Sequence, residues 1–205
     1  MYSIKNIYNI ISTTLIIVYF IYIILNSPPK TYKNGLNTKK TSSIYNDYNW
    51  NINGIINKNN CYSYATDVLD FNDKKLQPGQ LSGITNSLVY SCDNIMNRVN
   101  YDYDTYKTDC NSPCVEDYHK IFLAVDPKDL KDYHFYREEH PGYWSHKPGY
   151  NRTTSRDAVN RIIRDPRDAN KDYTTIFDKI LNNDDVLNYE VDCGCYCINT
   201  KNKHS

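Results

Sequence analysis

Cysteine spacing is the feature of this 205-residue chain that most restricts its fold. The chain has seven cysteines, and six remain for three disulfides once Cys61 is set aside. Near the carboxyl end, Leu187, Tyr189 and Val191 alternate with polar residues and lead into three alternating cysteines. This pattern predicts a strand with all three sulfurs on one face. The disulfide candidates are Cys92, Cys110, Cys114, Cys193, Cys195 and Cys197.

Zinc ligation and buried free thiols are the alternatives for these six cysteines. Cys110 and Cys114 could join the three terminal cysteines at a zinc ion if the domain faced the cytosol. The tight alternation of the terminal three does not match common paired-ligand spacings, which favours disulfides. We therefore predict no metal and no cofactor.

Charge balance argues against a polyanionic partner. Lys plus Arg and Asp plus Glu number 24 each, so no net field draws the chain to nucleic acid. The 21 tyrosines, with many Asn, Ile and Lys residues, resemble the codon bias of an AT-rich genome such as that of a large DNA virus.

An uncharged stretch from Ile7 to Leu25 predicts a single transmembrane helix over residues 7–26, after a short tail over 1–6. At about 1.5 Å per residue, its length matches a hydrocarbon core of about 30 Å. A cleaved secretory signal is the alternative, because Lys5 precedes the apolar run. The following residues lack the small-x-small pattern of a cleavage site, which favours the anchor.

Two observations disagree on the orientation of the anchor. Lysines cluster just after the apolar run, which favours a cytosolic domain. The cysteine content and the glycosylation candidate Asn151, in Asn151-Arg152-Thr153, favour a lumenal, extracellular or virion-facing domain. We expect the second orientation, in a host membrane if the chain is viral.

The rest of the chain divides into a polar stalk over 27–50, a folded domain over 51–199 and a tail over 200–205. Apolar spacing predicts a helix from Cys61 to Leu69, with Asn59 or Asn60 as its cap. The predicted strands are 120–125, 133–137 and 143–146, with a loop over 138–142, and short amphipathic helices are expected over 156–164 and 172–181.

One cysteine and two histidines suggest nucleophilic catalysis. Cys61 lies at the start of the predicted helix, and His134 and His146 lie on successive predicted strands. A thiol attacks carbonyls as thiolate, an imidazole can take its proton, and a third polar group orients the imidazole.

The order and local sequences of these residues resemble the NlpC-type and CHAP-type amidases of the papain-like cysteine hydrolases. Asn60-Cys61-Tyr62-Ser63-Tyr64-Ala65 is similar to the CHAP cysteine motif, and Gln77-Pro78-Gly79-Gln80 resembles the Pro-Gly-Asp turn of these families. The resemblance covers about residues 60–148. No Asp precedes Cys61 and a cysteine-bearing insertion follows Gly79, which leaves the substrate open.

The resemblance implies an α+β fold, a papain-like helix packed on an antiparallel sheet, preceded here by the transmembrane helix. It implies a membrane-anchored hydrolase acting on a peptide or other amide bond, with peptidoglycan as the substrate class. Cys61 would be the nucleophile, His134 the base and His146 its orienting group, and the Cys61 N–H with the Asn60 side chain would bind the oxyanion. The substrate-cleft candidates are Tyr133, Tyr136 and Trp144.

The alternative is a non-catalytic, disulfide-stabilised, membrane-anchored ectodomain with a binding or structural role. Cys61 would then be a buried or disulfide-bonded cysteine, and His134 and His146 would be cross-strand partners on a tyrosine-rich sheet.

Overall fold

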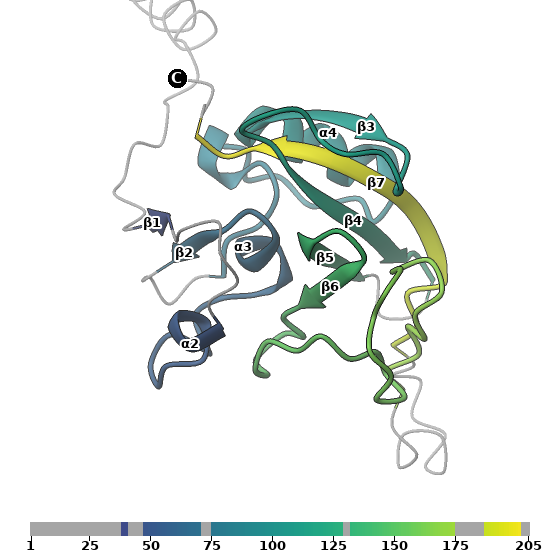
Figure 1. Ribbon diagram of the computed structural model, residues 1–205. Helices are drawn as coiled ribbons and strands as arrows, with labels where there is room; N and C mark the ends of the chain where they lie inside the picture. The colour runs from purple at the N-terminus through teal and green to yellow at the C-terminus, as the bar shows by residue number, and fades with distance from the viewer. Residues whose placement is uncertain (1–37, 41–46, 71–74, 129–131, 175–186, 202–205) are drawn as a thin grey trace, which may run out of the picture. The chain divides into compact units, whose positions relative to one another are not determined.

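A five-stranded antiparallel sheet forms the centre of the computed structural model, which describes residues 38–40, 47–70, 75–128, 132–174 and 187–201. The strand order is β3-β7-β4-β5-β6 (Figure 1). Three of these strands confirm the predictions over 120–125, 133–137 and 143–146. The bounds are β3 Asp104–Thr108, β4 His119–Asp126, β5 Asp132–His140, β6 Tyr143–His146 and β7 Val191–Asn199.

The helices are few and short: α2 Asp47–Trp50, α3 Cys61–Ala65, α4 Cys92–Asp102 and the 3-10 turn η1 Gln80–Ser82. Helix α3 begins at Asn60, whose side chain accepts a hydrogen bond from the Ser63 N–H. It ends at Ala65 rather than at the predicted Leu69. Asp67 adopts a left-handed backbone with φ of +54°, and β2 (Val68–Asp70) follows and pairs with β1 (Thr38–Lys40).

The predicted fold, a papain-like helix packed on a sheet after a transmembrane helix, is therefore wrong. The structure is mostly antiparallel sheet, and the helix that bears Cys61 has only five residues. The predicted span, Ile7 to Asn26, lies outside the described residues. In the part of the chain that the structure describes, no helix is long and apolar enough to cross a bilayer. We therefore withdraw two predictions: the membrane as a binding partner and the single-pass membrane localisation.

The predicted stalk contributes to the described structure. Strand β1 and helix α2 both lie within residues 27–50. Trp50, at the end of α2, is 1% exposed, and its ring meets Tyr64 of α3 edge-on with centroids 5.1 Å apart. Burial of this indole ties the segment before residue 51 to the domain.

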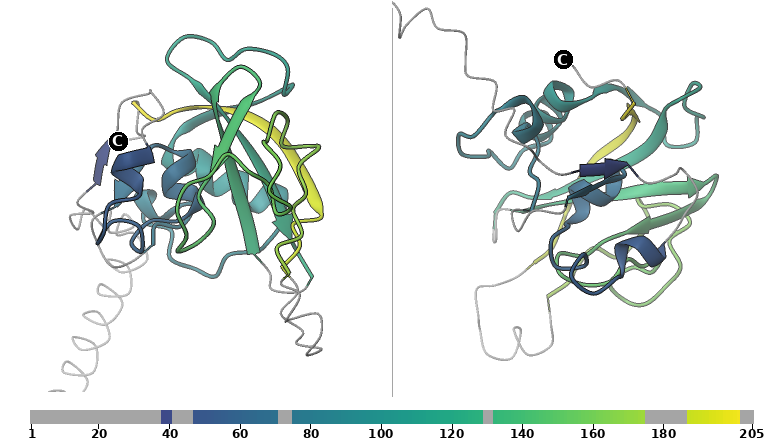
Figure 2. Two further views of the ribbon diagram at one scale, coloured as in Figure 1. Left: turned by 60° about the horizontal axis from the view of Figure 1, so that its bottom comes forward. Right: turned by 90° about the vertical axis from the view of Figure 1, so that its left-hand side faces the viewer.

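The two faces of the sheet are covered by different parts of the chain (Figures 1 and 2). On one face, α3 and α4 pack on the sheet and form what we call the helix-side cluster, which includes Tyr62, Ile95, Val99, Leu123 and Phe135. On the other face, the segment after β6 covers the loop-side cluster: Phe122, Ala124, Tyr136, Trp144, Ile163, Tyr189 and Cys195.

Three disulfides join β7 to distant segments, confirming that the six cysteines other than Cys61 pair. The bonds are Cys92–Cys193, Cys110–Cys195 and Cys114–Cys197. These bonds occupy all five cysteines of the zinc alternative.

The prediction that the three terminal cysteines share one face is wrong for Cys193. Opposite β4, Leu123 pairs with Gly194 and Ala124 pairs with Asp192, so Cys193 is an extra residue in a β-bulge. The bulge turns Cys193 into the helix-side cluster, whereas Cys195 belongs to the loop-side cluster.

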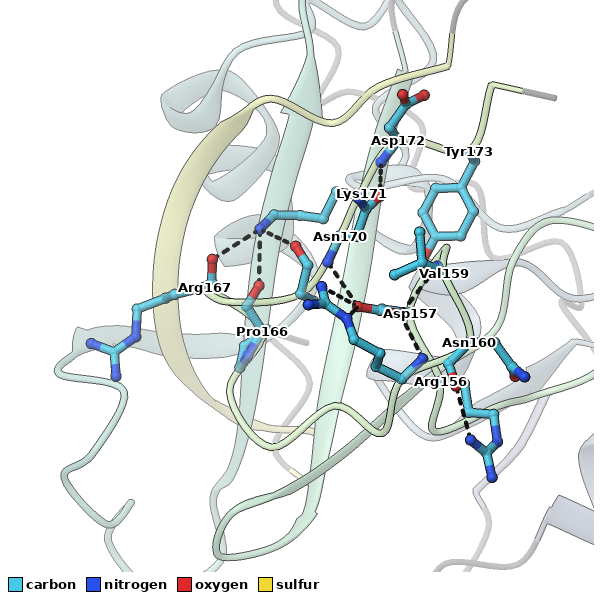
Figure 3. A network of polar contacts seen from close by, with 12 residues as sticks. Arg156, Asp157, Val159, Asn160, Pro166, Arg167, Asn170, Lys171, Asp172 and Tyr173 are labelled. Carbon is cyan, nitrogen blue, oxygen red and sulfur yellow. Dashed lines mark hydrogen bonds and ion pairs between the residues drawn. The ribbon is translucent and has the colours of Figure 1, made fainter. Parts of the chain in front are cut away.

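The helix predicted over 156–164 is also wrong, because a side chain takes over the hydrogen bonding of that segment. The Asp157 carboxylate accepts main-chain N–H bonds from Val159, Arg161 and Asn170 (Figure 3). Such side-chain-to-backbone bonds compete with helix formation. Asn160 at φ of +68° completes the turn. Of the helix predicted over 172–181, residues 175–181 lie outside the described residues.

Candidate active site

Two histidines on neighbouring strands form a direct hydrogen bond. Nε2 of His134 on β5 lies 2.7 Å from Nδ1 of His146 on β6, and Nε2 of His146 lies 2.9 Å from the carbonyl oxygen of Arg156. A carbonyl can only accept, so His146 carries its proton on Nε2. Its Nδ1 then accepts from His134 Nε2–H. This chain of bonds leaves His134 Nδ1 unprotonated, with a lone pair.

Burial keeps both imidazoles neutral. Desolvation lowers the pKa of His146 to about 4. Desolvation, with a smaller effect of repulsion between the two rings when both are protonated, holds the pKa of His134 well below its usual value. The rings of Tyr136, Tyr173 and Tyr189 surround the pair at centroid distances from His134 of 4.9, 6.1 and 5.1 Å. The pair therefore occupies an aromatic pocket on the loop side of the sheet.

The ordered loop after β6 holds the second histidine in this tautomer. The carbonyl of Arg156 accepts the hydrogen bond from His146 Nε2–H. Arg156 directly precedes Asp157, whose carboxylate accepts the network of main-chain N–H bonds. In the same loop, the Lys171 ammonium donates to the carbonyls of Pro166, Arg167 and Ala169 (Figure 3). These contacts fix the acceptor that orients His146.

Cys61 lies beside the main chain of His134. Its thiol is 3.7 Å from the Tyr133 carbonyl oxygen, and the Phe135 N–H hydrogen-bonds to the sulfur. These main-chain groups flank His134 on the part of β5 that precedes its pairing with β6, which begins at Tyr136.

The thiol at rest is buried and neutral. Cys61 is 6% exposed and belongs to the helix-side cluster, whereas the His134 ring points to the loop side. Burial, with a smaller effect of the Asp132 charge, raises the pKa of the thiol to about 12. Cys61 is the free cysteine among the described residues. The structure thus brings the two rings together on the loop side, and it leaves the sulfur on the helix side, bonded to the main chain on either side of His134.

The other predicted site residues divide between the two faces. Tyr136 lies in the pocket, 4.9 Å between ring centroids from His146, but Tyr133 belongs to the helix-side cluster and bonds to Gln77. Trp144 packs in the loop-side cluster. The Asn60 amide donates to the Leu76 carbonyl while its oxygen accepts from Ser63, so the side chain serves as the helix cap. Asn151 is exposed and stays a glycosylation candidate.

Sequence reasoning missed a buried ionic network that fastens α3 to the two histidine-bearing strands. The Arg137 guanidinium bonds to Glu139, to Asp67 and to the Tyr64 carbonyl. The Tyr64 hydroxyl bonds to Glu139 and Ser145, and Ser145 directly precedes His146. Charged residues on a strand gave no signal by themselves, because charged runs are usually solvated.

Lys147 was also missed. It is fully buried, and its ammonium donates to the carbonyls of Ile56, Gly149 and Asn151 at 2.7, 2.8 and 3.1 Å. Burial, with a smaller effect of Lys75, lowers its pKa to about 8. Lys147 joins the loop after β6 to the segment before α3.

Together, the fold and site define a disulfide-stapled antiparallel-sheet protein with a buried histidine pair on one face of β5 and a buried free cysteine against the main chain of the same strand. Insoluble matrix shell protein 1 of Ruditapes philippinarum is 34% identical to the chain over 138 residues, 63% of this chain and 82% of that protein. The chain belongs to the same family as this shell protein. No protein-family model matches the sequence, and no solved structure matches the chain.

Proposed function

We propose that the chain is a cysteine hydrolase that cleaves an amide bond, with Cys61 as nucleophile, His134 as base and His146 as the orienting group. The supporting observation is the hydrogen-bonded series from the Arg156 carbonyl through His146 to His134, which leaves His134 Nδ1 free to accept a proton. The Cys61 thiol lies 3.7 Å from the carbonyl oxygen of Tyr133, the residue that directly precedes His134.

The resting thiol and imidazole are both neutral, so the proton moves during attack rather than before it. For this transfer the thiol must leave the Tyr133 carbonyl and the helix-side cluster and turn around the strand edge toward His134 Nδ1, where it transfers its proton as sulfur bonds to the amide carbon. His146 accepts from His134 Nε2–H throughout and stabilises the imidazolium that forms.

The remaining steps balance with water as co-reactant. The C–N bond breaks as His134 returns its proton to the leaving amine, which leaves a thioester on Cys61. Water, deprotonated by His134, then hydrolyses the thioester and restores the thiol. The Cys61 main-chain N–H supplies an oxyanion donor, without the Asn60 side chain that is engaged in capping α3.

A mechanism-based probe tests this function. The full chain is incubated at pH 7 with a peptidyl acyloxymethyl ketone, and labelling is located by mass spectrometry. We expect a covalent adduct on Cys61 that is lost in Cys61→Ala and in His134→Ala. His140→Ala, which removes an exposed imidazole at the end of β5, is the control for the loss of an imidazole elsewhere. An adduct that forms equally fast in His134→Ala contradicts the proposal.

A structural role in an insoluble matrix is the second candidate, favoured by the kinship with insoluble matrix shell protein 1. The three disulfides support it, because they suit an oxidising compartment and resist unfolding. Sedimentation of the purified chain with and without reductant tests this role. A purely structural protein sediments identically as wild type and as Cys61→Ala and shows no probe adduct.

A further inference from the structure

A cavity of about 550 Å³ opens over the loop-side face of β5, next to the histidine pair. Its wall combines His134 with a carboxylate and several aromatic rings. The lining residues are Asp132, His134, Pro148, Gly149, Tyr150, Asn151, Tyr173, Leu187 and Tyr189. A ligand in this cavity therefore lies against the residue that we propose as the base.

Asp132 is the acidic residue of the wall, and it is held in place by neutral donors. Its carboxylate accepts from the Tyr189 hydroxyl at 2.8 Å and from the Tyr133 N–H at 2.8 Å. Two bonds leave lone pairs on both oxygens. Among the ion pairs of the described residues, none involves Asp132.

A second wall residue already holds an ammonium group. The Lys75 Nζ lies 3.0 Å from the centroid of the Tyr150 ring, and the Lys75 charge also acts on Asp132. A cation over an aromatic face is attracted by the ring quadrupole. The contact with Lys75 shows that the Tyr150 ring can bind an ammonium group.

We propose that Asp132 and Tyr150 bind a primary ammonium group of the substrate, either a lysine side chain or a free amino terminus. This inference rests on the proposed hydrolase for its substrate, but not for the binding itself. Lys75 competes with the incoming ammonium group for the same ring and carboxylate.

The spacing along β5 fits this role. Asp132 and His134 are two residues apart on one strand, so their side chains share a face about 7 Å apart. The ammonium group would be anchored at Asp132 while the amide carbon lies near His134. The neighbouring Tyr173 and Leu187 would contact the apolar part of the same substrate.

Calorimetric titration of the full chain carrying Cys61→Ala tests the site without turnover. Three peptides serve as probes: acetyl-Gly-Lys-Gly amide, acetyl-Gly-norleucine-Gly amide and Gly-norleucine-Gly amide with a free amino terminus. We expect a probe with an ammonium group to bind about tenfold more tightly than the uncharged one. The two charged probes distinguish a side-chain amine from a terminal amine.

Three substitutions in this background identify the residues responsible. Asp132→Asn reduces the preference to less than about twofold, whereas Asp168→Asn, which removes an exposed carboxylate outside the cavity, preserves it. Lys75→Met strengthens binding of the charged probes, because it removes the internal competitor. Thermal unfolding of each variant verifies folding.

Equal binding of the charged and uncharged probes overturns the inference, as does a preference that survives Asp132→Asn. The proposed hydrolase fails differently, through the absence of a Cys61 adduct in the wild type. A charge preference without an adduct therefore leaves the ammonium site standing, and an adduct without a preference leaves the hydrolase standing.

Discussion

The two faces of strand β5 differ in chemistry although they share one backbone. Tyr133 and Phe135 point into the helix-side cluster, which is built mainly from aliphatic and aromatic side chains. His134, between them, points to the loop side, where its ring bonds to His146 and is surrounded by tyrosines. Alternation along one strand thus places Tyr133 and Phe135 in the helix-side core and the polar His134 against the loop-side cluster.

The difference shows that a polar site can be buried when each of its groups has a partner. On the helix side, stability comes from apolar area removed from water. On the loop side, the buried imidazoles depend on a hydrogen-bonded series that ends at the Arg156 carbonyl. The loop side therefore needs an ordered loop, and the Asp157 network supplies it.

Replacement of His134 by Ala should produce the largest effect of these variants, and the property that it changes is the reactivity of Cys61. We expect the rate of Cys61 modification by the acyloxymethyl ketone to fall by about 10²- to 10⁴-fold, because the proton acceptor is lost. The measurement is the time course of adduct formation by mass spectrometry. His140→Ala, at the exposed end of the same strand, should retain the wild-type rate. A rate in His134→Ala above a tenth of wild type contradicts the role of the base.

Replacement of the adjacent Phe135 by Ala should instead affect stability. The side chain is fully buried on the helix side, so truncation should lower the free energy of unfolding by about 3–5 kcal/mol. Urea denaturation measures the change. Val89→Ala, at a position that is 58% exposed, should change it by less than about 0.5 kcal/mol. Similar losses in the two variants would show that Phe135 is not part of a tightly packed core.

Stability should fall on acidification because the histidine pair is buried neutral. In the unfolded chain both rings titrate near pH 6.5, whereas burial lowers the pKa of His146 to about 4 and holds that of His134 well below its usual value. Between pH 6.5 and 4 the unfolded chain binds more protons. Stability is therefore complete above pH 6.5 and is lost as the pH falls, by up to about 1.4 kcal/mol per pH unit for each ring.

Urea midpoints at pH 7, 6 and 5 test this dependence. His134→Gln should show a shallower slope than the wild type, since one titrating ring is gone, while His140→Gln should keep the wild-type slope. The difference between variants cancels the contribution of carboxylates common to both. Identical slopes in wild type and His134→Gln would place the pH dependence elsewhere.

The smallest effect is expected from Asp157→Asn, which weakens the loop-side network next to the pocket and replaces no residue that lines it. Loss of the charge on an acceptor of three main-chain N–H bonds should cost about 1–2 kcal/mol. Hydrogen exchange should increase at Val159, Arg161 and Asn170 before it increases in β5. Asp168→Asn, at an exposed position in the same loop, is the matched control. Unchanged protection in Asp157→Asn would show that the network does not order the loop.

Local patterns in the sequence predicted the central strands and the start of α3, because apolar runs and the Asn60 cap act over a few residues. The same reasoning extended α3 too far and placed a helix over 156–164. Both errors arise where a side chain or a left-handed residue redirects the backbone, as at Asp67 and Asp157. The papain-like packing that we predicted from short motifs is wrong, because it depended on a longer α3 than the structure has.

Among the site residues, the sequence singled out Cys61, His134 and His146 from residue type and order. It could not show that the two rings are hydrogen-bonded, because the register of β5 against β6 determines which residues face each other. Nor could it show Asp132, Tyr150 and Lys75 together, since they come from separate segments.

By itself, the sequence predicted that six cysteines would pair and singled out Cys61, His134 and His146, since count, type and spacing are properties of the chain. Tertiary structure alone determined which cysteines pair, since a single bulge at Cys193 turned one sulfur to the helix side. It also determined that His134 faces a ligand-sized cavity while the Cys61 thiol lies on the helix side. The physical reason is that facing and pairing depend on register and long-range packing, which local residue patterns do not encode.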